Sequence, residues 1–293
     1  MKTYLTEFFE EFSYPEEACS ALTQAYDRIT ANPLSRSGFE ALLRCYANDK
    51  NMDYGQAFHK MAEISGEVGI HNYTGELLLL ICFSRTLRGY YEEAGIDQQI
   101  WHTSMCDLKY KLDECKCVYD IWGTFVCWWF TGFFDMTRFG FLKLQFEIQP
   151  FGYRYEKKGI VLTPESPVLN THIPRTGTKL DPESMRKSYE MGAAFFRERF
   201  QVEPVAFVCH SWLLYPRNKE VLSPDSNLYA FISGYDILKV EEDKDYSEVW
   251  RLFDVNYEGD VEKLPQDTSL RRGYAEWIRK GEKTGCAYGV HIM

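Results

Sequence analysis

Apolar residues recur every three or four positions through roughly the first 120 residues, which is the period of an amphipathic helix. Residues 5, 8, 9 and 12 follow this spacing, and Pro15 ends their helix because proline cannot continue its hydrogen bonds. A second helix begins at Pro15 and ends at Asn32 and Pro33. Further helices are predicted over residues 38–47, 54–68, 74–94 and 97–119. Residues 77–83 are apolar on every side, which predicts the central helix of a bundle.

The pattern changes from helical to alternating after residue 119. Residues 139–148 alternate, which predicts one strand with a polar face that carries Phe141, Lys143, Gln145 and Glu147. Shorter strands are predicted at residues 159–162 and 167–173.

A helix from Pro182 to about residue 200 follows, with Asp181 placed to cap its first amides. A buried strand comes next, so this part of the chain reads as a βαβ unit with parallel strands and a right-handed crossover. Beyond it we predict a helix over residues 225–235, a strand over 235–240 and a helix over 267–280. The sequence therefore predicts an α+β protein, a helical N-terminal domain followed by a mixed-sheet α/β domain.

The buried strand of this unit ends in polar residues. Pro204 precedes an apolar run at residues 205–209, which ends at His210 and Ser211. Ligands of open α/β sheets bind outside the carboxyl ends of the strands, so His210 is a candidate functional residue. The alternative is a core histidine whose ring hydrogen-bonds backbone groups. Strand alternation places Cys209 on the opposite face from His210, which argues against a nucleophile pair made from these neighbours.

Composition and charge narrow the class of protein. The 293 residues include 45% hydrophobic and 16% aromatic side chains, which is typical of an ordered globular protein. A formal charge of −10 disfavours a phosphate backbone as partner, because nucleic-acid binding needs clustered cations. The apolar stretches at residues 77–83 and 121–134 are shorter than the roughly 18–20 residues that cross a bilayer. With no secretory signal in the first residues, we expect a cytoplasmic protein that does not span a membrane.

Cysteine spacing gives no sign of a disulfide framework or a metal centre. Nine cysteines are scattered along the chain, which favours reduced thiols. The closest pair is Cys115 and Cys117, with only Cys106 and His102 nearby on the same predicted helix. Zinc sites combine such pairs with further ligands at paired spacing, so we expect no metal site.

Several short segments resemble one protein family. They read LKLQFE at residues 142–147, VLNTHIP at 168–174, FVCHSWLL at 207–214, LSPDSN at 222–227 and LPQDTSL at 264–270. Together they resemble the bacterial acyltransferase domain-containing family, which pairs a helical N-terminal domain with a GNAT-like C-terminal domain. The resemblance implies a helical domain over residues 1–122 and a GNAT-like domain over residues 123–293. It also implies an acyl-CoA-dependent N-acyltransferase that uses acetyl-CoA or another acyl-CoA and acts on an unknown small acceptor.

The resemblance also implies a cofactor-binding loop. In GNAT proteins the pyrophosphate of CoA rests on backbone amides where a helix begins, as the helix dipole favours. The matching loop consists of Arg175, Thr176, Gly177, Thr178 and Lys179. It departs from the GNAT pattern, because Gly177 is its one glycine and two acidic residues, at positions 181 and 183, lie where the helix begins. The alternative is an ordinary capped helix after a polar turn.

Acyl transfer needs a base for the acceptor and an acid for the leaving thiolate. Glu147, His172 and His210 are the candidate bases, because each is a polar group near a strand end in an apolar region. Tyr235 falls where the resemblance implies a catalytic acid. The alternative is a buried polar network in which the two histidines hydrogen-bond each other or Glu147.

Two other classes of function fit the sequence. A hydrolase would use His210 with Ser211 or Cys209 and would not need CoA. A non-catalytic binding protein would hold a ligand or partner against the aromatic block at residues 128–134.

Overall fold

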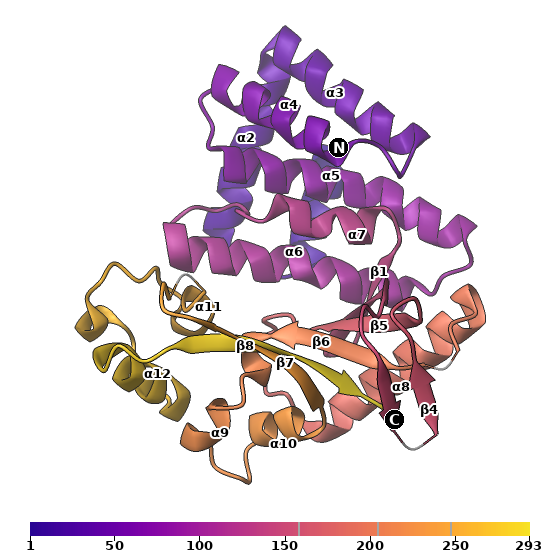
Figure 1. Cartoon of the computed structure of the whole chain (residues 1–293). Helices are drawn as coiled ribbons and strands as arrows, with labels where there is room; N and C mark the ends of the chain where they lie inside the picture. The colour runs from indigo at the N-terminus through magenta and orange to yellow at the C-terminus, as the bar shows by residue number, and fades with distance from the viewer. Residues whose placement is uncertain (158, 204, 247) are drawn as a thin grey trace. The chain divides into compact units, whose positions relative to one another are not determined.

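The chain forms two compact units, Met1–Gly140 and Phe141–Met293. The computed structural model (Figure 1) describes residues 1–157, 159–203, 205–246 and 248–293. Pro204, which we expected to precede the buried strand, therefore lies outside the described residues.

The first unit is helical, as predicted. Its main helices are α1 (Lys2–Glu11), α2 (Glu16–Ala31), α3 (Pro33–Asn48), α4 (Tyr54–Glu67), α5 (Asn72–Glu93) and α6 (Gln98–Tyr119). The predicted start of α3 at residue 38 was wrong, because the Asn32 side chain accepts hydrogen bonds from the Leu34 and Ser35 amides and caps a helix that begins at Pro33. Asn32 thus ends one helix and begins the next.

Helix α5 is the central helix of this unit (Figure 1). It contacts α1, α2, α3, α4 and α6, and every residue from 77 to 83 is at most 2% exposed. A surface helix would bury only one stripe of its residues, whereas this segment is surrounded. The prediction of a central helix at these residues is confirmed.

The segment after α6 belongs to the same unit by its contacts. It contains η1 (Cys127–Phe130), α7 (Thr131–Phe134) and the start of β1 (Arg138–Phe141). The Tyr46 hydroxyl donates to the Phe134 carbonyl at 2.9 Å, and the Trp129 indole donates to Asp107 at 2.7 Å. We predicted the domain boundary between residues 122 and 123, ahead of this segment. Phe130, Phe133 and Phe134 of the aromatic block are fully buried, so they fill the core of this unit.

The second unit is built on a mixed sheet. Its strand order is β1-β2-β5-β6-β8-β7, and β3 and β4 form a separate pair. The bounds are β2 (Leu144–Pro150), β3 (Tyr155–Lys157), β4 (Ile160–Leu162), β5 (Pro167–His172), β6 (Phe207–Ser211), β7 (Asp236–Asp243) and β8 (Thr284–His291). Strands β5 and β6 are parallel and are joined through α8 (Pro182–Phe200), so the predicted βαβ unit is present.

Shorter helices connect the remaining strands. They are η2 (Trp212–Leu214), α9 (Asn218–Val221), α10 (Asn227–Ser233), α11 (Trp250–Phe253), η3 (Val261–Lys263) and α12 (Ser269–Arg279). A hydrophobic cluster forms after β6 and includes two residues of α12. Its members include Tyr215, Phe253, Tyr274 and Trp277, and it is separate from the cluster of Val168, Val208 and Val290 in the sheet.

Two strand predictions were wrong. The alternating run at residues 139–148 is two strands, β1 and β2, separated at residues 142 and 143 by a turn in which Leu142 has φ +52°. Leucine rarely adopts this conformation, so no turn signal was visible there.

Strand β8 was not predicted at all, although it pairs with both β6 and β7. Its glycines lower strand propensity, but a Cβ at Gly285 would overlap the Glu241 carbonyl oxygen, so glycine allows the close approach.

Helix α8 covers one face of the sheet. The Tyr189 ring packs on Phe146 and Phe207 at centroid distances of 5.6 and 4.7 Å. Gly192 lets the helix approach this closely, because an added Cβ would lie 2.5 Å from Cδ2 of Phe146. Residues that alternate with Phe146 and Phe207 along their strands therefore point to the opposite face.

We expect Gly192→Ala to lower the free energy of unfolding by about 1–3 kcal/mol, because the new methyl group pushes α8 off the sheet. The matched control is Gly89→Ala in α5, where an added Cβ meets nothing within 4 Å. That change should leave stability unchanged or raise it by up to about 1 kcal/mol. Urea unfolding of the three proteins provides the measurement, and equal effects of the two substitutions would contradict the packing argument.

Candidate active site

The two parallel strands β5 and β6 are joined only at their start. Their register pairs Leu169 with Phe207 and Asn170 with Val208. Beyond these pairs, β5 continues along β2 up to His172, and β6 continues along β8 up to Ser211. The strands therefore part toward their carboxyl ends, and their facing backbone groups there are not used in the pairing of β5 with β6. Such a gap at a carboxyl end is where α/β sheets bind ligands.

Glu147 and His172 form a hydrogen-bonded pair beside this gap. Glu147 lies opposite Asn170 in the β2–β5 register, and His172 lies two residues further along β5, so all three side chains share one face. Nε2 of His172 lies 2.7 Å from Oε1 of Glu147, and the two side chains are 18% and 20% exposed. A carboxylate this close stabilises the charged form of an imidazole. Two of the three candidate bases are thus brought together.

The Asn170 amide contacts both members of this pair. Its Nδ2 donates to the same Glu147 oxygen at 3.2 Å and lies 3.4 Å from Nε2 of His172. A hydrogen bond to the Glu147 carboxylate requires a hydrogen on Nε2 of His172, whereas a hydrogen bond from the Asn170 amide would require a lone pair on that nitrogen. The 2.7 Å contact is the shorter one, so Nε2 donates to Glu147 and Nδ1 carries the lone pair of the neutral ring.

Gln145 adds a buried acceptor to the same face. It lies directly opposite His172 in the register and is 2% exposed. Among the described residues its Oε1 has no hydrogen-bond partner. A buried carbonyl without a donor is costly, so a donor from solvent or a ligand would be stabilised there. Strand alternation predicted Gln145 on the polar face with Glu147, and this pattern is the sequence signal for its position.

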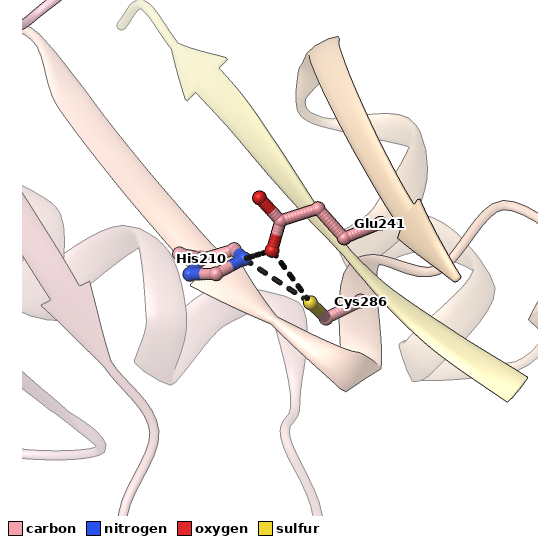
Figure 2. Close-up of side chains that lie close together, drawn as sticks. All are labelled: His210, Glu241 and Cys286. Atoms are coloured by element: carbon pink, nitrogen blue, oxygen red, sulfur yellow. Dashed lines mark hydrogen bonds and ion pairs between the residues drawn. The ribbon is translucent and has the colours of Figure 1, made fainter. Parts of the chain in front are cut away.

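His210 belongs to a different group of side chains. It lies in β6 on the same face as Asn170 and contacts Cys286 of β8 and Glu241 of β7, as Figure 2 shows. Glu147 and His172 therefore hydrogen-bond each other, whereas His210 contacts Cys286 and Glu241. Burial, with the nearby charge of Glu241, raises the pKa of Cys286 to about 11. Cys286 was missed from the sequence because its strand was not predicted.

Cys209 and Ser211, the neighbours of His210 in sequence, have structural roles. Cys209 points to the face covered by α8, as alternation predicted, and its burial raises the pKa of its thiol to about 12. The Ser211 hydroxyl accepts a hydrogen bond from the Leu213 amide at 3.1 Å and caps η2. Neither residue is placed as a nucleophile for His210, so the hydrolase that pairs His210 with Ser211 or Cys209 has no geometric support.

Tyr235 lies on the α8 face of the sheet. Its hydroxyl hydrogen-bonds the Tyr189 hydroxyl at 2.6 Å, and its ring packs beside His291 at 5.5 Å. Burial, with the neighbouring Tyr189, raises the pKa of Tyr235 well above its ordinary value. His172 and Glu147 occupy the opposite face. The role of Tyr235 as an acid, like that of His210 as a base, stays a prediction.

The predicted cofactor loop is held by ion pairs and turns. Nη2 of Arg175 contacts Oδ2 of Asp254 at 2.7 Å, and Arg271 contacts the same oxygen at 2.6 Å. Gly177 has φ +70°, and the Thr176 and Thr178 hydroxyls lie 2.8 Å apart. The loop is exposed at positions 175 and 177–179, so its cations are accessible.

The start of α8 is both capped and cationic. Asp181 accepts a hydrogen bond from the Ser184 amide at 2.9 Å, which lowers the pKa of its carboxyl group and confirms the predicted cap. Glu183 pairs with Lys187 at 2.8 Å, which offsets its charge. Lys143, which the sequence analysis did not single out, contacts the Thr178 hydroxyl through its Nζ. Lys143 and Lys179 therefore add positive charge to the loop.

A mixed sheet with two parallel strands that part at their carboxyl ends, followed by a polar loop and a helix, defines a GNAT-like fold. Residues 136–291 match the family model described as the GNAT-like C-terminal domain, and residues 3–136 match the N-acyltransferase N-terminal domain. The chain belongs to this family, and the predicted fold class is confirmed.

Solved acyltransferase structures share this fold along the chain. A complex with decanoyl-CoA matches with a TM-score of 0.76 and 20% identity, covering 98% of this chain and 86% of that one. A complex with decanoyl-CoA and teicoplanin gives a TM-score of 0.74, 20% identity and the same coverage, 98% and 86%. A complex with CoA and 10C-teicoplanin gives a TM-score of 0.74 and 18% identity, covering 98% of this chain and 86% of that one.

No curated protein matches the chain. Among the described residues, no helix has both the length and the apolar character to cross a membrane.

We expect Asp254→Asn to lower the free energy of unfolding by about 1–3 kcal/mol, because it removes the shared carboxylate from Arg175 and from Arg271, which is only 16% exposed. The control is Glu248→Gln, which removes an exposed ion pair to Arg251 and should change stability by less than about 0.5 kcal/mol. Denaturant unfolding compares the two, and a loss no larger than the control's would show that this carboxylate does not anchor the loop.

Proposed function

We propose that this protein transfers an acyl group from an acyl-CoA to an amine of a small-molecule acceptor. The observation that carries the proposal is the Glu147–His172 pair, which lies at the carboxyl end of β5 where the parallel strands part. The similar acyltransferase structures, which contain CoA or decanoyl-CoA, support an acyl-CoA as the donor. Teicoplanin in two of them supports a small molecule as the acceptor class.

The donor has a complementary surface on the second unit. In this proposal the pantetheine arm enters between β5 and β6, where backbone groups beyond Asn170 and Val208 can hydrogen-bond its amides. The pyrophosphate meets the loop at residues 175–179, with Lys143 and Lys179 as its cations. Asp181 occupies the cap of α8, so side-chain charge contributes more here than the helix amides do.

The Glu147–His172 pair supplies the base. An acceptor amine attacks the thioester carbonyl only after it has lost a proton, and Nδ1 of His172 takes that proton. Glu147 orients the ring through Nε2 and stabilises the imidazolium that forms, as a carboxylate does in a catalytic triad. The new C–N bond forms and the C–S bond breaks. The proton held by His172 passes to the departing CoA thiolate, and the second proton that the nitrogen loses as the amide forms goes to solvent.

Gln145 and Glu147 favour an amine over a neutral alcohol. An ammonium group offers several N–H donors, and the partner-free Oε1 of Gln145 is an acceptor beside His172. The Glu147 carboxylate attracts a positive charge to the same face. The face therefore suits a cationic acceptor that is deprotonated in place.

Donor binding is tested by calorimetric titration with CoA and decanoyl-CoA. We expect saturable binding that Lys143→Ala weakens by about tenfold, the equivalent of one lost charged hydrogen bond. Lys280→Ala, at the end of α12, serves as a control of equal charge and should not change the affinity. Absence of binding at millimolar CoA would overturn the proposal.

Turnover is tested by release of CoA thiol from decanoyl-CoA in the presence of a panel of small amines, with the acylated product identified by mass. His172→Ala should lower kcat about 100- to 10,000-fold while decanoyl-CoA still binds. Glu147→Gln keeps the shape of the pair but removes its charge, and a smaller loss is expected. His59→Ala, which changes an exposed histidine of α4, controls for substitution alone and should match the parent protein. CoA release that is independent of the amine, or a fully active His172→Ala, would contradict this mechanism.

A further inference from the structure

Three side chains from neighbouring strands converge on the face of the sheet opposite α8. Figure 2 shows His210 of β6, Glu241 of β7 and Cys286 of β8 pointing toward one another. The register explains the convergence, because Glu241 lies opposite Cys286, and Tyr288, two residues further along β8, lies opposite His210. The strands themselves therefore hold the three side chains on one face.

The three donor atoms form a compact triangle. Nε2 of His210 lies 3.1 Å from Sγ of Cys286 and 3.2 Å from Oε2 of Glu241, and the sulfur lies 3.6 Å from that oxygen. Tetrahedral zinc with ordinary bonds to nitrogen, oxygen and sulfur separates such donors by about 3.4–3.6 Å. The triangle thus has nearly the size of one face of a zinc coordination tetrahedron.

The same geometry argues against a catalytic triad. In a triad the carboxylate contacts one imidazole nitrogen and the nucleophile contacts the other. Here both Glu241 and Cys286 contact Nε2 of His210. The thiol of Cys286 also lies within reach of Oε2 of Glu241 as a donor, so all three polar atoms gather around one point, where a single cation would bind them together.

We propose that His210, Glu241 and Cys286 bind one divalent cation of the zinc class, with its fourth coordination position open. A thiolate, an imidazole and a carboxylate together favour zinc over magnesium or calcium, which prefer oxygen ligands. No fourth histidine, cysteine or acid within the described chain joins the group, and His210 and Glu241 are 48% and 43% exposed. A solvent molecule or ligand therefore completes the coordination.

Lys239 supports this arrangement from outside the triangle. Its Nζ contacts Oε1 of Glu241 at 2.5 Å, so the second oxygen, Oε2, is directed at His210 and Cys286. Partners of this kind orient metal ligands in known sites. The contact also compensates part of the negative charge that a thiolate and a carboxylate bring together.

The proposal is separate from the acyl-transfer function. An ion on Nε2 of His210 uses a lone pair that a base would need, so a metal-bound His210 cannot act as a base through that nitrogen. The proposed acyl-transfer base is His172, on another strand. Metal binding and acyl-CoA binding can thus succeed or fail independently.

The test is a titration of the chelator-treated full-length protein with Co(II), followed by competition with Zn(II). We expect one equivalent of Co(II) to bind with a near-ultraviolet thiolate-to-cobalt charge-transfer band, which one equivalent of Zn(II) abolishes. Cys286→Ser should remove the band and weaken binding more than about 100-fold, beyond the effect of losing an outer partner. The matched control is Cys117→Ser, which changes an exposed thiol of α6 and should leave the band unchanged.

Two further variants protect the test from a folding artefact. Glu241→Gln keeps a side chain of the same shape and should weaken binding while the thiolate band persists at saturating Co(II). Circular dichroism checks that each variant is folded, and zinc should raise the Tm of the parent protein but not that of Cys286→Ser. Absence of saturable binding, or an unchanged thiolate band in folded Cys286→Ser, would overturn the proposal.

Discussion

The second unit depends on how its two parallel strands are held apart. Strands β5 and β6 share two residue pairs, and each is then secured by an antiparallel neighbour, β2 for β5 and β8 for β6. The hydrogen bonds of these antiparallel ladders satisfy the backbone groups along one edge of each strand, whereas the edges of β5 and β6 that face each other separate. Helix α8 packs against Phe146 of β2 and Phe207 of β6, and so supports the sheet on both sides of the gap. An opening in a sheet would otherwise expose unpaired backbone without a rigid frame.

The two faces of this sheet have different compositions because alternation separates them. One face carries aromatic rings around Tyr189, where α8 excludes water. The other carries the Glu147–His172 pair and the His210 group. The titratable side chains therefore share their face with a second buried cluster that includes Val168, Val208 and Val290, and the face packed by α8 gives the rigidity that holds them in position. Although the whole chain is acidic, the loop before α8 gathers cations on a small area.

Sequence patterns predicted the elements that depend on local periodicity. They did not predict the features that depend on how distant strands pair. The helical bundle and the β5–α8–β6 unit follow from apolar spacing and caps, so they were predicted. Glu147 and His172 were candidates because they lie near strand ends, but only the antiparallel register brings them within 2.7 Å. Strand β8 was missed because its glycines are required by neighbours far away in the sequence. Cys286 was missed with it, and the turn at Leu142 concealed how Lys143 reaches the loop.

The carboxylate of Asp254 binds Arg175 and Arg271 at one oxygen, and this sharing affects how easily the loop can exchange partners. If Arg175 moves to an incoming anion, Asp254 keeps Arg271 as its counter-ion, so no charge is left without compensation. Arg271 in turn stays fixed through its contacts with the Leu252 carbonyl and Asp267. Asp254 would thus remain neutralised if Arg175 turned to an anion, because its ion pair with Arg271 does not depend on Arg175.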